Sequence, residues 1–363
     1  MRIAVTGLSG NVGSQLLPRL LADPAVTSVA GLARRPPDRD SPLADGVDWH
    51  AADLGDPGCA DAVARFLRGA DAVVHLAWRV TPAHDRAAMQ RVNVEGTRTV
   101  IRAALDAGVD AFVHASSVGA YSHGPADKGQ RVDEAWPTGG LASSAYSRDK
   151  VAAERMLDEA EAERPDLRVV RVRPAIVLQR QAAAEQARYF LGPFVPASVV
   201  RAAFIPLVPD HERFQLQVVH AEDVADVFAR AAVSDAARGG LNVADEPVLD
   251  PPRLAELLGA RRVPVSPTAL RAFVDATWRL HVQPTDPGWV DLAFGIPLLD
   301  TAKVRRELGW APTRDAGAVL LEALSGVADG AGGPSAVLRP LGAPAERLLD
   351  AFRTLLPGRG GTQ

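Results

Sequence analysis

Three glycines near the start of the chain constrain the fold more than any other feature. The segment Val5–Ser14, VTGLSGNVGS, places Gly7, Gly10 and Gly13 at three-residue spacing, between a strand-like run and a helix-like pattern. In such a strand–turn–helix the first glycine permits a tight turn and the second lets the backbone approach a pyrophosphate. The third lets the helix pack closely on the strand, and the phosphates lie at the positive helix end. We therefore expect a dinucleotide to bind at Gly7, Ser9, Gly10, Asn11, Val12 and Gly13.

Two alternatives apply to this turn. No Gly-Lys-Ser/Thr follows the glycines, which argues against a phosphate loop of an ATPase or GTPase. A glycine-rich turn without any ligand is the other alternative, and the position of the turn between a strand and a helix disfavours it.

The N-terminal half alternates short apolar runs with helical patterns. We expect strands at Arg2–Thr6, Thr27–Ala33, Val47–Ala51, Asp71–Leu76, Ala111–Ala115 and Leu167–Arg173. We expect helices near Asn11–Ala22, Cys59–Arg68, Met89–Ala107 and Ala145–Glu163. Repeated units of this size predict an α/β fold, with a doubly wound parallel sheet covered by helices on both faces.

Several local patterns make this expectation more detailed. The apolar run from Ala72 predicts a central strand, and the alternating run Leu167–Arg173 predicts a strand nearer the edge. Pro18 removes a backbone donor inside the first helix, so we expect a bend there. The glycine-rich run Gly326–Ala336 is typical of a flexible linker, and an amphipathic tail helix is expected to begin at Pro344.

Composition excludes several classes of function. The 363 residues carry a formal net charge of -4 without a basic stripe, so we expect no nucleic-acid partner. A single cysteine, Cys59, allows neither an internal disulfide nor a cysteine-based zinc site and fits a reducing compartment. No apolar run reaches the length of a membrane span and no signal core is visible, so a soluble, cytoplasmic protein without membrane contact is expected.

Three histidines in or beside the expected strands raise the question of a metal site. His75, His114 and His220 lack the converging spacing of metal ligands, so we expect no metal. Core histidines with hydrogen-bond partners are the better interpretation.

The residues after the second expected strand bear on the choice of nucleotide. An acidic residue there binds a ribose 2′-hydroxyl, whereas an arginine holds a 2′-phosphate. The strand ends in Arg34 and Arg35, which favours NADP(H), because a guanidinium is well shaped for phosphate. NAD remains the alternative, since Asp38 and Asp40 lie nearby and both arginines can equally be solvated surface charges.

A third position after a strand has two equally favoured interpretations. Asp53 and Leu54 follow the expected strand Val47–Ala51, where they can face an adenine ring. Asp53 can equally cap the following turn.

These features occur in an order that resembles the extended short-chain dehydrogenases/reductases, the NAD(P)-dependent epimerase/dehydratase family. The resemblance rests on Gly7–Gly13, Asp53-Leu54, VVHLAW at Val73–Trp78, Asn93 in VNVEGT, HASSVGAYS at His114–Ser122 and YSRDK at Tyr146–Lys150. Later matching segments are RPAIV at Arg173–Val177, VVHAEDVAD at Val218–Asp226 and LDTAKVRRELGWAP at Leu299–Pro312. The coverage runs from Met1 to about Leu324.

The resemblance implies a fold class and a division into domains. The fold is a Rossmann-type doubly wound parallel sheet with a smaller, mostly helical C-terminal substrate-binding domain. We expect residues 1–173 and the returning segment 208–244 to bind NAD(P), and residues 174–207 and 245–325 to bind substrate. Residues 326–363 form the linker and tail helix. The helices near Met89–Ala107 and Ala145–Glu163 imply that a homodimer can form.

The resemblance gives Tyr146 and Lys150 their roles. Hydride transfer at a carbonyl or carbinol carbon also moves a proton at the oxygen, and a free tyrosine with a pKa of about 10 is a poor base at neutral pH. Lys150 lies one helical turn from Tyr146, on the same face. Its charge, with that of an oxidised nicotinamide, is expected to lower the pKa of Tyr146, the acid/base residue.

Other positions take roles only through the resemblance. Ser117 is the catalytic serine, with Ser116 as the alternative, and Lys150 also binds the nicotinamide ribose. Asn93 is a structural or proton-relay residue. The expected cofactor contacts further include Leu76, Ala77, Asn93, Tyr146, Lys150, Pro174 and Ile176.

The substrate is expected to be a small molecule bound between largely apolar walls. Trp78, Val118 and Phe204 are the expected substrate residues, and such walls suit a ketone or secondary alcohol on a hydrophobic framework. A carbonyl reductase or alcohol dehydrogenase is therefore favoured. A nucleotide-sugar epimerase or dehydratase is the first alternative, and a non-catalytic NADP(H)-binding sensor the second.

Overall fold

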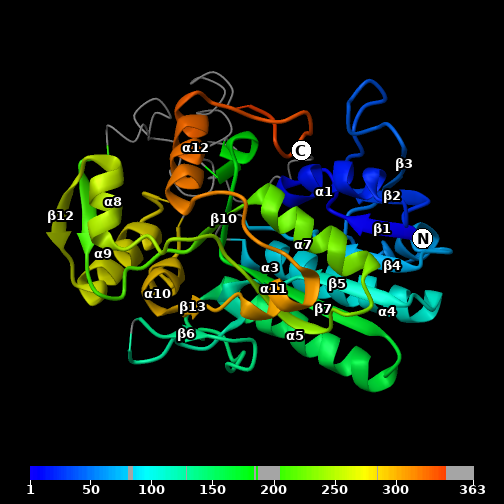
Figure 1. Cartoon of the computed structure of the whole chain (residues 1–363), viewed down its shortest axis with the longest axis horizontal. Helices are drawn as coiled ribbons and strands as arrows, with labels where there is room; N and C mark the ends of the chain where they lie inside the picture. The colour runs from blue at the N-terminus through cyan, green and yellow to red at the C-terminus, as the bar shows by residue number, and fades with distance from the viewer. Residues whose placement is uncertain (81–84, 128, 184, 187–204, 284, 341–363) are drawn as a thin grey trace.

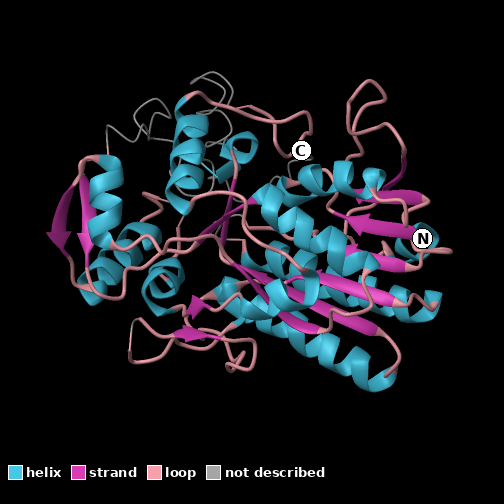
Figure 2. Cartoon of the chain, viewed as in Figure 1, coloured by secondary structure: helices cyan, strands magenta, loops and turns pink. Residues whose placement is uncertain are grey.

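The chain folds around one parallel sheet (Figure 2). The structure, a computed structural model, describes residues 1–80, 85–127, 129–183, 185–186, 205–283 and 285–340. The strand order is β11-β7-β5-β4-β1-β2-β3. The strands are β1 (Arg2–Thr6), β2 (Ser28–Ala33), β3 (Val47–Ala51), β4 (Ala72–His75), β5 (Ala111–Ala115), β7 (Arg168–Pro174) and β11 (Gly239–Val243). The order reverses between β1 and β4, and ligands of such sheets bind at that point, beyond the carboxyl ends of the strands.

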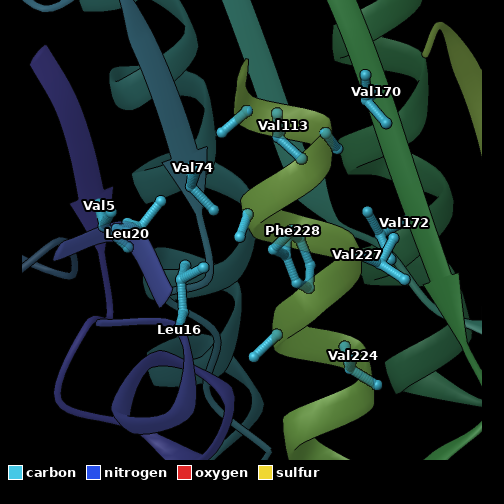
Figure 3. Packing of buried hydrophobic residues seen from close by; sticks show 14 of the residues in the cluster. Val5, Leu16, Leu20, Val74, Val113, Val170, Val172, Val224, Val227 and Phe228 are labelled. Atoms are coloured by element: carbon cyan, nitrogen blue, oxygen red, sulfur yellow. The ribbon is translucent and has the colours of Figure 1, made fainter. Parts of the chain in front are cut away.

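Helices cover both faces of the sheet, which confirms the predicted doubly wound α/β architecture. The first face carries α1 (Asn11–Ala22), α7 (Ala221–Val233) and α11 (Ala302–Leu308). The second carries α2 (Ala60–Phe66), α4 (Gly96–Ala107) and α5 (Ala145–Glu163). Figure 3 shows how Phe228 of α7 packs among valines of β4, β5 and β7. Alternate strand residues face opposite layers, so each face buries its own apolar cluster.

A smaller, mostly helical region follows the sheet in sequence. Its helices are α8 (Pro251–Leu258), α9 (Pro267–Arg279), α10 (Gly288–Gly295) and α12 (Ala316–Ala328). Three short parallel pairs accompany them: β8 (Ile176–Leu178) with β10 (Val218–His220), β9 (Leu207–Asp210) with β12 (Arg261–Pro264), and β6 (Arg131–Val132) with β13 (Leu298–Leu299). In Figure 1, α8, α9 and β12 lie at the opposite end of the molecule from β1–β3.

The helix expected at Met89–Ala107 is interrupted. It consists of α3 (Arg86–Gln90), one π-helical turn over Arg91–Glu95, and then α4. The Thr97 hydroxyl donates to the Asn93 carbonyl at 2.6 Å, and such back-bonding by a threonine distorts a helix locally. The π turn carries Asn93, in keeping with the tendency of π turns to occur at functional sites.

The expected position of β7 is confirmed, since it is second from the edge of the sheet whereas β4 is central. Its residues Arg168, Arg171 and Arg173 are nevertheless all buried. One other expectation needs correction. The Gly326–Ala336 segment is not a free linker, since α12 continues to Ala328 and Leu338 further on is fully buried.

The α1 helix continues through Pro18 to Ala22, and the bend expected at Pro18 stays a prediction. The expected tail helix from Pro344 lies outside the described residues. None of the helices in the described ranges is both long and apolar enough to cross a membrane.

A buried ion pair joins α5 to β7. The Arg173 guanidinium donates to both carboxylate oxygens of Glu154, at 2.8 and 2.5 Å, and to the Tyr121 hydroxyl at 2.9 Å. Arg173 and Glu154 are each at least nine-tenths buried. Removal of one partner would leave a buried charge unpaired, which is costly in a medium of low dielectric constant.

We predict that Arg173→Met lowers the free energy of unfolding by about 3–5 kcal/mol, because Glu154 loses its partner. Arg102→Met is the matched control, since Arg102 pairs with Glu163 at 2.8 Å on the surface and its removal should leave stability nearly unchanged. Urea unfolding measures both variants. Equal stability of the two would contradict the structural importance of the buried pair.

Candidate active site

Tyr146 and Lys150 lie in the first turns of α5, beside the carboxyl end of β5. The Lys150 ammonium donates to the Ala115 carbonyl at 2.6 Å and lies 3.3 Å from the centre of the Trp78 ring. It is 5.8 Å from the centre of the Tyr146 ring. The spacing of four residues therefore brings both side chains to one face of α5, as predicted.

The structure brings Ser117, and not Ser116, to the Tyr146 hydroxyl. The Ser117 side chain lies beside Tyr146 and its oxygen accepts from the Gly119 amide at 3.0 Å. The Ser116 hydroxyl instead donates to Glu154 at 2.5 Å. A side chain at Gly119 would come within 2.9 Å of the Tyr146 ring, so glycine permits the ring to lie against this turn.

The electrostatics of the pair differ from the expectation. Burial raises the pKa of Tyr146 to about 12, and the hydrogen bond from Ser117 acts in the opposite direction. Burial also lowers the pKa of Lys150 well below its usual value, while the carboxylates of Glu154 and Asp149 oppose that shift. In the protein alone, desolvation of the phenol is the largest effect on its pKa. The lowering of the Tyr146 pKa by Lys150 together with an oxidised nicotinamide stays a prediction for the complex.

The glycine turn forms a cradle at the carboxyl end of β1. Gly7 has a φ of +72°, and a Cβ there would lie 2.7 Å from the Ala77 amide nitrogen. A Cβ on Gly13 would lie 2.4 Å from the Leu8 carbonyl oxygen. At Gly10 the Gly7 oxygen, at 3.2 Å, is the only atom of the described residues within 4 Å of a Cβ, so these residues leave open space above it. No side chain in the described ranges caps α1, and its first turn holds no acidic residue, an arrangement that suits phosphate groups.

The remaining cofactor positions predicted in the turn surround this cradle. Ser9 is buried, whereas Asn11 and Val12 are partly exposed at the start of α1. Sequence reasoning missed Gln179, whose amide donates to the Asn11 backbone oxygen at 2.8 Å and to its side chain at 2.6 Å. A buried glutamine 168 residues away in sequence gave no local pattern that could reveal it.

Arg34 and Arg35 follow β2 as exposed side chains without an ion pair in the part of the chain that the structure describes. Asp53 accepts a hydrogen bond from the Gly55 amide at 2.9 Å, which is the predicted turn cap. Leu54 is buried against Gly96 of α4. The structure therefore shows the capping role of Asp53.

Most other predicted residues lie at the same edge of the sheet. The amides of Leu76 and Ala77, just after β4, donate to Thr6 at 3.1 and 3.3 Å. Asn93 accepts from the Arg79 amide at 2.8 Å and donates to the Arg79 carbonyl at 3.0 Å, a structural clamp.

The last predicted positions differ in exposure. Pro174 ends β7 and is buried, whereas Ile176 in β8 is 40% exposed. Val118 is buried beside Tyr121. The predicted substrate residue Phe204 lies outside the described residues.

The buried histidines only partly match the expectation. His75 hydrogen-bonds Thr6 at 2.7 Å and Thr97 at 2.9 Å, and burial lowers its pKa to about 3. His220 accepts from the Glu222 amide at 3.2 Å. His114, however, has no partner at either ring nitrogen within the described ranges, so the prediction of a hydrogen-bonded histidine is wrong there. Those ranges also contain no group of histidine, cysteine and acidic residues placed to hold a metal ion.

A small cavity beside Tyr146 contains residues that sequence reasoning missed. Arg79, Arg86, Asp149, Asp286 and Trp289 line it. The Trp289 ring lies 5.3 Å from the Tyr146 ring, centre to centre. A Cβ on Gly288 would lie 2.7 Å from Ser144 Cα, so this glycine lets α10 pack directly on the start of α5. Two arginines within eight residues of Trp78 were the only local indication in the sequence.

A family model describes most of this architecture. Residues 3–244 match the model of the "NAD dependent epimerase/dehydratase family". The match includes the glycine turn, Ser117, Tyr146 and Lys150.

Individual relatives are more distant. An uncharacterized protein of Mycobacterium tuberculosis is 29% identical over 317 residues, which cover 87% of this chain but only 29% of that protein. The L-arabinose 1-dehydrogenase (NAD(P)(+)) of Haloferax volcanii is 36% identical over 116 residues, or 32% of this chain and 41% of that enzyme.

Solved structures show the same fold. UDP-glucose 4-epimerase of Thermus thermophilus, solved in complex with NAD, superposes with a TM-score of 0.64 at 22% identity, over 90% of this chain and 99% of that one. The family match, the seven-stranded sheet and the glycine cradle together establish that the chain belongs to the NAD-dependent epimerase/dehydratase family of extended short-chain dehydrogenases/reductases.

Proposed function

We propose that the protein is an NADP(H)-dependent oxidoreductase that interconverts a carbonyl and a secondary alcohol. The observation that carries the proposal is that Ser117, Tyr146 and Lys150 come together beside the glycine cradle at one edge of the sheet. The seven-stranded sheet binds the cofactor and the helical region supplies substrate contacts.

The residues present fit a dinucleotide. The open space above Gly10 and the uncapped start of α1 suit a pyrophosphate. Arg34 and Arg35 are exposed and free to hold a ribose 2′-phosphate, which favours NADP(H) over NAD. Bound NADPH supplies the hydride that reduces the carbonyl carbon.

Residues of the chain itself bind and protonate the carbonyl oxygen of the substrate. Ser117 holds the carbonyl oxygen against Tyr146, and the Tyr146 hydroxyl gives it a proton as the alkoxide develops. Burial raises the pKa of Tyr146 to about 12, so the hydroxyl is protonated at neutral pH and can act as a proton donor. Lys150 contributes a positive charge beside the resulting phenolate and, with Ala115 fixing its position, a donor toward the cofactor ribose.

A sugar substrate is the second candidate. The match to L-arabinose 1-dehydrogenase covers 32% of the chain, and it supports oxidation or epimerisation of a sugar hydroxyl. A nucleotide-sugar epimerase would convert its substrate without net consumption of cofactor, whereas a reductase consumes NADPH in proportion to product. Absorbance at the nicotinamide band separates the two. A pure NADP(H) sensor would not need Ser117 or Tyr146.

We predict that Tyr146→Phe and Ser117→Ala lower kcat for ketone reduction by about 10²–10⁴-fold while NADPH still binds, because proton transfer is lost but the cradle is intact. Ser116→Ala is the matched control and should keep most activity, since its hydroxyl points to Glu154. NADPH oxidation against a panel of ketones gives the rates. Full turnover by Tyr146→Phe would remove this residue from the reaction.

We also predict that Arg34→Ala raises the Kd for NADPH by about 10- to 100-fold and leaves NADH binding nearly unchanged, because one charged hydrogen bond to the 2′-phosphate is lost. Arg39→Ala, an exposed arginine further along the same loop, is the control. Fluorescence titration measures both nucleotides. Equal weakening of NADPH and NADH would overturn the assignment of the phosphate site.

A further inference from the structure

The cavity beside Tyr146 is lined by two arginines whose guanidinium groups are not fully paired within the described residues. Arg79, Arg86, Met89, Tyr146, Asp286 and Trp289 line it. Any substrate whose carbonyl reaches Tyr146 must place the groups next to that carbonyl in or beside this cavity. The chemistry of its lining therefore bears on the substrate class.

Arg86 is oriented by a chain of polar contacts. Its Nη2 donates to Asp149 at 3.2 Å, and the second Asp149 oxygen accepts from Asn93 at 3.4 Å. The Asp149 carboxylate is 7% exposed and both its oxygens are engaged. The other guanidinium nitrogen of Arg86, Nη1, is buried and has no acceptor among the described residues. A buried donor without an acceptor raises the free energy of the folded protein, so a hydrogen-bond acceptor at this nitrogen would be favourable.

Arg79 adds a second positive charge. Its backbone is fixed at both the amide and the carbonyl by Asn93. Its guanidinium forms no ion pair within the described parts of the chain, and it lines the same cavity. The cavity is therefore lined by the oriented guanidinium of Arg86 and by that of Arg79, which is unpaired within the described ranges.

The carboxylates at the cavity do not satisfy these donors. Both Asp149 oxygens already accept hydrogen bonds, one from Arg86 and one from Asn93. Asp286 accepts from the Gly288 amide at 2.8 Å. No ion pair joins Asp286 to Arg79 or Arg86 in the described ranges, although Arg86 is close enough to favour the charged form of Asp286. Among the described residues no acceptor reaches Arg86 Nη1, so an anionic group of a bound molecule would be a suitable partner for it.

We infer that the substrate carries a carboxylate close to the carbon that is reduced, and that this carboxylate accepts from Arg86 Nη1 with Arg79 adding charge. The substrate class is an oxo acid, with the corresponding hydroxy acid as product. The inference rests on the proposed function. The oxo acid gains a hydride at the carbonyl carbon from NADPH and a proton at oxygen from Tyr146, which solvent reprotonates; NADP⁺ is released.

Paired substrates test this inference. Oxo acids with apolar tails, such as phenylpyruvate, are compared with their methyl esters, which have the same carbonyl but no charge. We expect kcat/KM for the acid to exceed that for the ester by at least about tenfold in the unmodified protein, and Arg86→Gln to reduce this ratio about 10- to 100-fold. Arg86→Lys should restore part of the ratio, because it keeps the charge without the fork of donors.

Controls separate substrate recognition from folding. Arg98→Gln, at an exposed arginine of α4 paired with Glu95, should leave the acid-to-ester ratio unchanged. The Kd for NADPH should be unchanged in Arg86→Gln, and the ratio within one variant does not depend on the folded fraction. An equal preference for acid and ester in the unmodified protein, or an unchanged ratio in Arg86→Gln, would overturn the inference.

A binding measurement distinguishes failure of the inference from failure of the proposed reaction. If neither partner of any pair is reduced, the redox proposal fails, and phenylpyruvate and its ester are titrated against the NADPH complex by tryptophan fluorescence. Trp78 and Trp289 flank Tyr146, so they report occupancy. Tighter binding of the acid that Arg86→Gln abolishes supports the anion site; equal binding of acid and ester refutes it.

Discussion

The buried carboxylate of Glu154 holds together the elements on which the candidate site depends. It lies one turn after Lys150 on α5 and accepts from Ser116 at 2.5 Å and from Arg173 of β7. Ser116 lies between Ala115, whose carbonyl accepts from the Lys150 ammonium, and Ser117, which lies beside Tyr146. One charged group thus fixes the end of β5 relative to α5. Because Arg173 neutralises this carboxylate in a buried environment, loss of either charged partner would leave the other one unpaired.

Burial governs the chemistry of the two titratable residues at the site. Tyr146 lies between Trp78 and Trp289, and Lys150 lies over the Trp78 ring. Desolvation therefore favours the neutral forms of both the phenol and the amine. A bound cofactor and substrate would bring charge and hydrogen-bond partners to the same place. The electrostatic cooperation expected of Tyr146 in its proposed acid/base role would then be a property of the complex more than of the protein alone.

The fold and the site differed in how far the sequence predicted them. Strand–helix alternation and the glycine spacing are local patterns, so they predicted the parallel sheet, α1 and α5 with ends within about two residues. The same periodicity could not predict the π turn at Asn93, which depends on the Thr97 hydroxyl and the backbone of Arg79. The burial of the β7 arginines likewise depends on hydrogen-bond partners on α5 and α7, which the pattern of the strand does not contain.

The sequence by itself determined the family, the cradle at Gly7–Gly13 and the pairing of Tyr146 with Lys150, because each depends on spacing along one or two neighbouring elements. Only the tertiary structure decided between Ser116 and Ser117, and only it brought Arg86, Asp149 and Trp289 beside Tyr146. Those residues come from α3, α5 and α10, which are far apart in the chain. Contacts of that kind follow from how helices pack on the sheet, and no local pattern records them.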